Sequence, residues 1–151
     1  VRRVLCMLGS MTRLSLSPDV ITCSAAISAC EKGGQWQLAV WLLWHSAHLC
    51  ITPNVITCSA AISACERRGQ WQVALCTLEH MLHLLIPPDI FTCNAAVAAC
   101  EKDGEWEWAV HLLSRVSLLH LEPDIFTCNA AISTCEKGSQ WQLALHLLGH
   151  V

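Results

Sequence analysis

A short polar residue recurs every 35 residues along this chain, inside segments that are otherwise small and apolar. The four positions are Ser24, Ser59, Asn94 and Asn129. Hydroxyl and carboxamide groups both donate and accept hydrogen bonds, so these side chains can match the Watson–Crick edge of a nucleobase. Ser and Asn also favour helix N-termini, and a role in starting helices is the alternative interpretation.

Cations recur with the same period, each directly after a glutamate. The four cations are Lys32, Arg67, Lys102 and Lys137. One cation per unit would form a stripe that contacts phosphates. The alternative is compensation of the helix dipole, which is worth about 0.3–1 kcal/mol at a helix C-terminus. The preceding glutamates have the character of a solvated face, and within a groove they would weaken phosphate attraction.

Cysteine and histidine spacings do not predict a metal site. Eight cysteines form pairs seven residues apart, namely Cys23/Cys30, Cys58/Cys65, Cys93/Cys100 and Cys128/Cys135. Seven helical residues span roughly 10.5 Å, too far for a disulfide or for two ligands of one metal, so we expect buried thiols acting as small hydrophobes. Helical metal spacing does occur at His45/His48, His80/His83 and His146/His150. Without a third ligand these are expected to be surface residues, with zinc as the weaker alternative.

The elements that position these residues are set by an internal repeat. Prolines recur at Pro18, Pro53, Pro88 and Pro123, and each is followed by a similar segment. The first unit predicts a helix that begins near Thr22 as N-cap and ends at the Gly33–Gly34 pair. A second helix begins near Gln35–Trp36 and ends before Pro53, because the residue before a proline is disfavoured in helix. Stacked hairpins of this kind form an all-α solenoid, and we expect the tryptophans mostly to fill the interfaces between hairpins.

Composition excludes several broad classes of protein. Hydrophobic residues make up 54% of the 151 and charged residues 14%, which excludes an intrinsically disordered chain. The longest strictly apolar run, Leu38 to Trp44, is seven residues, whereas a membrane span needs about 20. The net charge of −3 does not indicate a strongly basic nucleic-acid-binding protein, so any contact with nucleic acid requires a local stripe of cations. No phosphate loop, nucleophile elbow or carboxylate dyad appears, and we expect neither an enzyme nor a cofactor.

The segment Pro-Asp-Ile-Phe-Thr-Cys-Asn-Ala-Ala-Ile-Ser-Thr-Cys-Glu-Lys-Gly, residues 123–138, resembles the pentatricopeptide repeat. Four features of that family recur here in register: the period, the Thr-x-Asn start of the unit, the Lys near the end of the first helix and the Pro-Asp ending. The resemblance implies an α-solenoid that binds single-stranded RNA at one base per repeat. It also implies full repeats over 20–54, 55–89 and 90–124, with partial repeats over 1–19 and 125–151.

The resemblance further assigns roles to residues. In the family, the fifth and the last residue of a unit choose the base, and the second residue packs on it. The base-reading pairs are then Ser24 with Asn54, Ser59 with Asp89 and Asn94 with Asp124, with Asn129 unpaired. The base-packing residues are then Ile21, Ile56, Phe91 and Phe126, for which a core or helix-staple role is the alternative. The family's code implies a core of 5′-A-G-U followed by a pyrimidine.

Two partner classes follow from this interpretation. The first is single-stranded RNA, with a role in organellar RNA processing or expression. The second is other proteins, since an acidic array with few repeats can serve as an interaction scaffold without binding RNA. Family resemblance implies a mitochondrion or plastid, although no transit peptide is visible in the chain. We expect no membrane partner.

Overall fold

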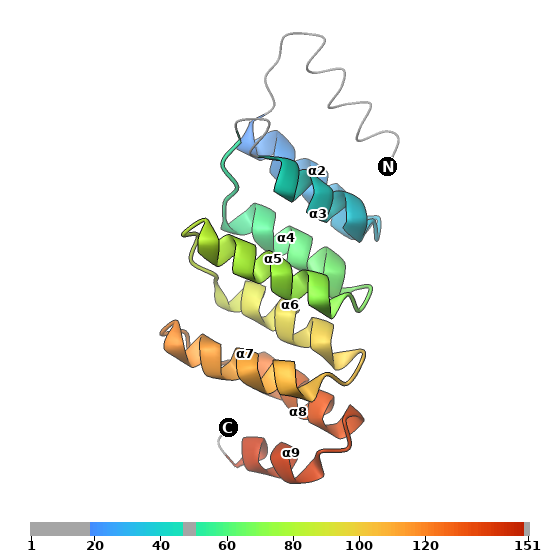
Figure 1. Cartoon of the computed structure of the whole chain (residues 1–151), viewed down its shortest axis with the longest axis vertical. Coiled ribbons are helices and arrows are strands. Elements are labelled where there is room, and N and C mark those ends of the chain that lie inside the picture. Colours follow the sequence, from blue (N-terminus) through green and yellow to red (C-terminus); the bar gives the residue numbers. More distant parts are fainter. Residues whose placement is uncertain (1–18, 47–50, 150–151) are drawn as a thin grey trace.

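The computed structural model describes residues 19–46 and 51–149, and these form eight helices and no strand (Figure 1). Their bounds are α2 Val20–Lys32, α3 Trp36–His45, α4 Val55–Glu66, α5 Trp71–His83, α6 Ile90–Glu101, α7 Trp106–Leu118, α8 Ile125–Lys137 and α9 Trp141–Leu148. The predicted all-α class is confirmed. Of the partial repeat predicted over 1–19, only Asp19 lies within the described residues, and His48 and His150 lie outside them.

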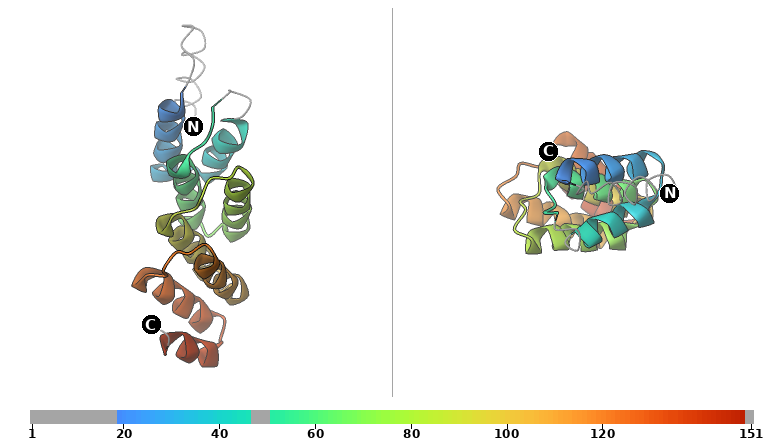
Figure 2. Two further views of the ribbon diagram at one scale, coloured as in Figure 1. Left: turned by 90° about the vertical axis from the view of Figure 1, so that its left-hand side faces the viewer. Right: turned by 90° about the horizontal axis from the view of Figure 1, so that it is seen from above.

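Helices pair into four hairpins that stack in one direction, from α2 at the top of Figure 1 to α9 at the bottom. The first helices of the hairpins (α2, α4, α6 and α8) pack directly on one another. The second helices α3, α5 and α7 each pack between two first helices, and α9 packs on α8. Figure 2 shows the resulting two layers. Because its helices lie closer together, the first layer forms the inner side of the stack. The predicted solenoid of helical hairpins is therefore confirmed.

Each first-layer helix begins one residue after an aspartate or asparagine. Asp19 is the N-cap of α2, and its Oδ1 accepts a hydrogen bond from the Thr22 backbone N–H at 2.8 Å. The same bond recurs at the starts of α4, α6 and α8. The prediction of Thr22 as N-cap was therefore wrong by one turn. Both residue types cap well, and the aspartate comes first along the chain.

Tight turns join the two helices of each hairpin where the glycine pattern predicts them. Gly34, Gly69 and Gly104 adopt left-handed backbone with φ of 65°, 65° and 69°, and Ser139 does so with φ of 58°. Glycine reaches this region without the steric penalty that a Cβ brings. At Gly34 an added Cβ would also lie 2.6 Å from Arg68 Nη2 of the next hairpin. These turns bring successive hairpins together.

Small residues fill the core between first-layer helices. Ala61, Ala96 and Ala131 are fully buried, as are Cys65 and Cys100, and their small volume lets neighbouring helices approach closely. The predicted burial of the cysteines is confirmed for seven of the eight, with Cys128 half-buried.

The tryptophans divide into two groups. Trp36 and Trp71 pack against the core, and Trp106 abuts Gly138 of the next hairpin. The prediction that they mostly fill interfaces is wrong for four that are exposed, namely Trp41, Trp44, Trp108 and Trp141. No helix in the described ranges has the length and apolar character needed to cross a bilayer.

Candidate nucleic-acid interface

Asn94 and Asp124 form a direct pair between two successive first-layer helices. Asn94 Nδ2 donates to both Asp124 carboxylate oxygens, at 3.2 and 3.1 Å. The Thr127 hydroxyl lies within hydrogen-bonding distance of both partners, and its one proton is donated to Asp124 Oδ1, at 2.8 Å, or to Asn94 Oδ1. The Thr127 N–H, and the Thr127 and Asn94 side chains, hold the pKa of the Asp124 carboxyl below its usual range. This predicted reading pair thus shares one hydrogen-bonded cluster.

Ser59 and Asp89 are linked through one intermediate hydroxyl. Thr92 Oγ1 donates to Asp89 Oδ1 at 2.6 Å, and Ser59 Oγ lies 2.5 Å from the same Thr92 oxygen. Because the Thr92 proton is directed at the carboxylate, Ser59 is the donor toward Thr92. The second predicted pair is therefore also joined across the repeat boundary.

Ser24 and Asn54 are instead engaged within their own helices. Ser24 Oγ donates to the Val20 carbonyl at 2.8 Å. Asn54 and Thr57 form a reciprocal capping box, in which Asn54 Oδ1 accepts from the Thr57 N–H at 3.0 Å. No hydrogen bond joins this pair in the described ranges. Asn129 occupies the equivalent place on α8 and is exposed.

The second residue of every unit is exposed on the first turn of its helix. Ile21, Ile56, Phe91 and Phe126 keep between 61% and 76% of their surface accessible. The core and staple alternatives are therefore wrong for these residues, and base packing stays a prediction. Phe91 and Phe126 line a cavity of about 310 Å³ together with Asn94 and Asp124. Two aromatic residues and one polar pair thus line a space large enough for a nucleobase.

The recurring cations link successive repeats. Arg67 Nη2 lies 3.2 Å from Glu31 Oε1 of the preceding unit, and Lys137 Nζ lies 3.1 Å from Glu101 Oε1. Lys102 Nζ donates to the Arg67 carbonyl at 2.5 Å, and Lys32 is exposed. Phosphate contact by these four cations stays a prediction, and two of them would exchange a carboxylate partner for a phosphate.

Thiols and imidazoles build no metal centre in the described ranges, where His, Cys, Asp and Glu side chains nowhere gather in threes. All nine described cysteines are free. Burial raises the pKa of Cys58 and Cys93 to about 11 and of Cys65 and Cys100 to about 12, so these thiols stay protonated and unreactive at neutral pH.

The third residue of each unit is the feature that sequence reasoning missed. Thr57, Thr92 and Thr127 are fully buried. The last two each bond to both predicted reading residues of the preceding unit. Their recurrence every 35 residues was visible, but it was interpreted as a cap.

Comparison with known families assigns the chain. The family model described as Pentatricopeptide repeat domain matches residues 7–67 and 78–137. The chain belongs to this family. No curated protein gives a significant match to the pentatricopeptide repeat chain.

Solved pentatricopeptide repeat structures share the fold. The maize protein PPR10 superposes with a TM-score of 0.81 at 20% identity, over 94% of this chain and 20% of that one. PPR10 in complex with an 18-nt psaJ RNA element superposes with a TM-score of 0.76 at 23% identity, and the match covers 95% of this chain and 22% of that one. The domain of Arabidopsis thaliana protein-only RNase P 1 in complex with tRNA gives 0.78 at 11% identity, over 95% and 78%. The chain spans about a fifth of PPR10.

Proposed function

We propose that the chain is a single-stranded RNA-binding module that reads one base per repeat along its inner layer. The observation that carries the proposal is the cavity that Phe91, Phe126 and the hydrogen-bonded Asn94–Asp124 pair line together. Exposed aromatic faces stack on bases, and the polar pair offers a donor and acceptors to a base edge. No catalytic role is proposed.

The solved relatives support this choice of ligand. PPR10 was crystallised with an 18-nt RNA element, and the PPR domain of protein-only RNase P 1 was crystallised with tRNA. By the family's pattern, the proposed target core is 5′-A-G-U followed by a pyrimidine. An organellar role in RNA processing or expression, in a mitochondrion or plastid, is part of the same proposal.

Selection from randomised RNA at a stated salt concentration tests the proposal. The purified chain should enrich the 5′-A-G-U core over the starting pool. A double variant, Phe91→Ala with Phe126→Ala, should bind at least tenfold more weakly, since base stacking is worth about 1–3 kcal/mol. Trp141→Ala is the matched control, because it removes an exposed aromatic from outer helix α9. Equal affinity of the double variant and the parent would contradict the proposal.

A protein-interaction scaffold is the second candidate, and a groove on the outer layer favours it. The groove measures about 670 Å³ and is lined mainly by apolar residues of α5 and α7, including Trp71, Leu75, Trp108 and Leu112. Such apolar hollows are typical of binding sites. If the chain bound no RNA even at low salt, this candidate would replace the first.

A further inference from the structure

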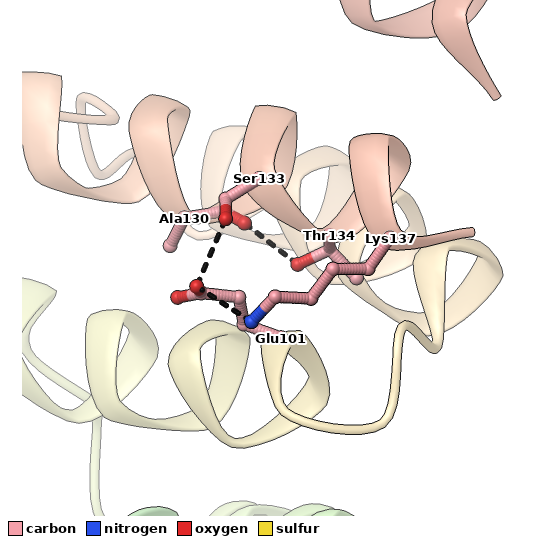
Figure 3. Close-up of polar contacts among 5 residues, drawn as sticks. All are labelled: Glu101, Ala130, Ser133, Thr134 and Lys137. Atoms are coloured by element: carbon pink, nitrogen blue, oxygen red, sulfur yellow. Dashed lines mark hydrogen bonds and ion pairs between the residues drawn. The ribbon is translucent and has the colours of Figure 1, made fainter. Parts of the chain in front are cut away.

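Glu101 is a glutamate of the inner layer whose carboxylate has two partners on the next first-layer helix. Its carboxylate accepts a hydrogen bond from Ser133 Oγ at 2.9 Å and pairs with Lys137 Nζ at 3.1 Å (Figure 3). Both partners come from α8, the next first-layer helix. Arg67, the C-cap of α4, forms the corresponding ion pair with Glu31 one hairpin earlier, although no hydrogen bond from Ser63, which corresponds to Ser133, reaches Glu31 in the part of the chain that the structure describes. Glu31 and Glu101 are therefore each paired with a cation of the unit that follows.

Glu66 lacks both of these partners. The residue that corresponds to Ser133 is Ala98, which has no hydroxyl. The residue that corresponds to Lys137 is Lys102, whose ammonium donates instead to the Arg67 carbonyl. Among the described residues, no hydrogen bond or ion pair reaches the Glu66 carboxylate, although the side chain is half-buried. Two local departures from the repeat thus leave one carboxylate without a partner.

Glu66 is one of the residues that line the cavity of the predicted third reading site. Phe91, Phe126 and Ala98 line the same cavity. Burial raises the pKa of the Glu66 carboxyl, partly opposed by Lys102 and Arg67. A half-buried residue with a hydrogen-bond acceptor therefore lines the space in which a base would stack.

We propose that Glu66 is a further specificity-determining residue, which accepts a hydrogen bond from a donor group of the nucleotide held between Phe91 and Phe126. The inference rests on the proposed RNA-binding function and concerns this site alone. An ionised carboxylate only accepts hydrogen bonds, so it favours a donor and disfavours a carbonyl or phosphate oxygen. Two donors on the uridine predicted for this site meet this requirement, the N3–H of the base and the ribose 2′-hydroxyl.

Deletion of single donors from the RNA distinguishes the two sources. The nucleotide facing α6 is uridine, the base predicted for this unit, in one RNA, 3-methyluridine in a second and 2′-deoxyuridine in a third, with the rest of the RNA unchanged. 3-Methyluridine lacks the N3–H donor, and the deoxynucleotide lacks the 2′-hydroxyl. A hydrogen bond to a charged group is strong enough that one of these deletions should weaken binding to the parent about tenfold or more.

Two variants connect that loss to Glu66. Glu66→Leu removes the acceptor, and Ala98→Ser supplies the hydroxyl that occupies Glu101 one unit later. In both variants the sensitive deletion should weaken binding less than threefold. Glu101→Gln is the matched control, because its carboxylate is already occupied, and it should keep the parent's full loss. Because Ala98→Ser adds only one oxygen atom to the side chain, it keeps the test decisive if Glu66→Leu folds poorly.

The inference fails alone if RNA binds but both deletions have the same effect in the parent, in Glu66→Leu and in Ala98→Ser. It also fails alone if neither deletion weakens binding to the parent. Absence of binding to every RNA by every protein, even at low salt, would overturn the proposed function and this inference with it.

Discussion

Asn94 and Asp124 lie thirty residues apart in the chain, yet the carboxamide of Asn94 donates to both oxygens of the Asp124 carboxylate. Asp124 is also the N-cap of α8, where it accepts the Thr127 N–H at 2.8 Å. One carboxylate therefore starts a helix and completes the predicted reading pair of the preceding unit. This dual role explains why the last residue of one repeat can act together with the fifth residue of the same repeat.

The two roles of Asp124 can be separated by mutation. Asp124→Asn keeps an oxygen for the cap, as Asn54 does at the start of α4, and should change the free energy of unfolding by less than about 0.5 kcal/mol. Asp124→Ala removes the cap and should destabilise by about 1 kcal/mol. Urea denaturation of both variants and the parent measures the difference. Equal destabilisation by the two substitutions would contradict the cap's contribution.

Specificity should change at one nucleotide when one reading pair is replaced. Ser24→Asn together with Asn54→Asp converts the first pair into the type found at Asn94 and Asp124, and should move preference from A toward U. Asp caps helices as well as Asn does, so the start of α4 is preserved. Binding to RNAs that differ only at this nucleotide measures the change. A uniform loss for all RNAs, or an unchanged preference, would count against base reading by this pair.

The repeat period was sufficient to predict the hairpins, their turns and their stacking. The repeat period did not determine which residue is the N-cap, because Asp19 and Thr22 are both good capping residues. Only the structure shows that Asp19 caps the helix and that Thr22 is the third residue of the unit. The exposure of Trp108 and Trp141 was also missed, since a sequence does not reveal which side of an outer helix meets a neighbour. The substitution of Ala98 for a serine was visible. Its effect on Glu66 could not be predicted, because the sequence does not show that this position faces the glutamate of the preceding unit.

The salt dependence of RNA affinity should show whether the stripe of four recurring cations contacts phosphates. Single-strand binding weakens with a log–log slope of about −0.7 per phosphate neutralised, so four contacts give roughly −2.8. Replacing Lys32, Arg67, Lys102 and Lys137 by Gln should flatten this slope and lower affinity for every sequence alike. Base preference should survive, because phosphate contacts position a strand without reading it. Unchanged affinity and slope in the quadruple variant would exclude the stripe as the phosphate contact.

Glu66 and Glu101 should titrate on opposite sides of the ordinary glutamate pKa. Burial raises the pKa of Glu66. At Glu101 burial also acts to raise the pKa, but the hydrogen bonds from Ser133 and Lys137 outweigh it and lower the value. Because the folded pKa of Glu66 exceeds its unfolded value, the ionised carboxylate destabilises the fold, and this destabilisation disappears as pH falls from the folded to the unfolded pKa. The stabilisation from Glu101 is lost as pH falls below its unfolded pKa, the reverse sign.

Carbon-detected NMR titration of the side-chain carboxyls measures both values, and reciprocal substitutions test their cause. Ala98→Ser should lower the pKa of Glu66, because the new hydroxyl donates to the charged form. Ser133→Ala should raise the pKa of Glu101 by removing the same kind of bond. Each substitution should leave the other glutamate's pKa in place, since each hydroxyl serves only its own inter-repeat step. If neither pKa moved, the hydroxyl at this position of the repeat would not be what separates an occupied glutamate from a free one.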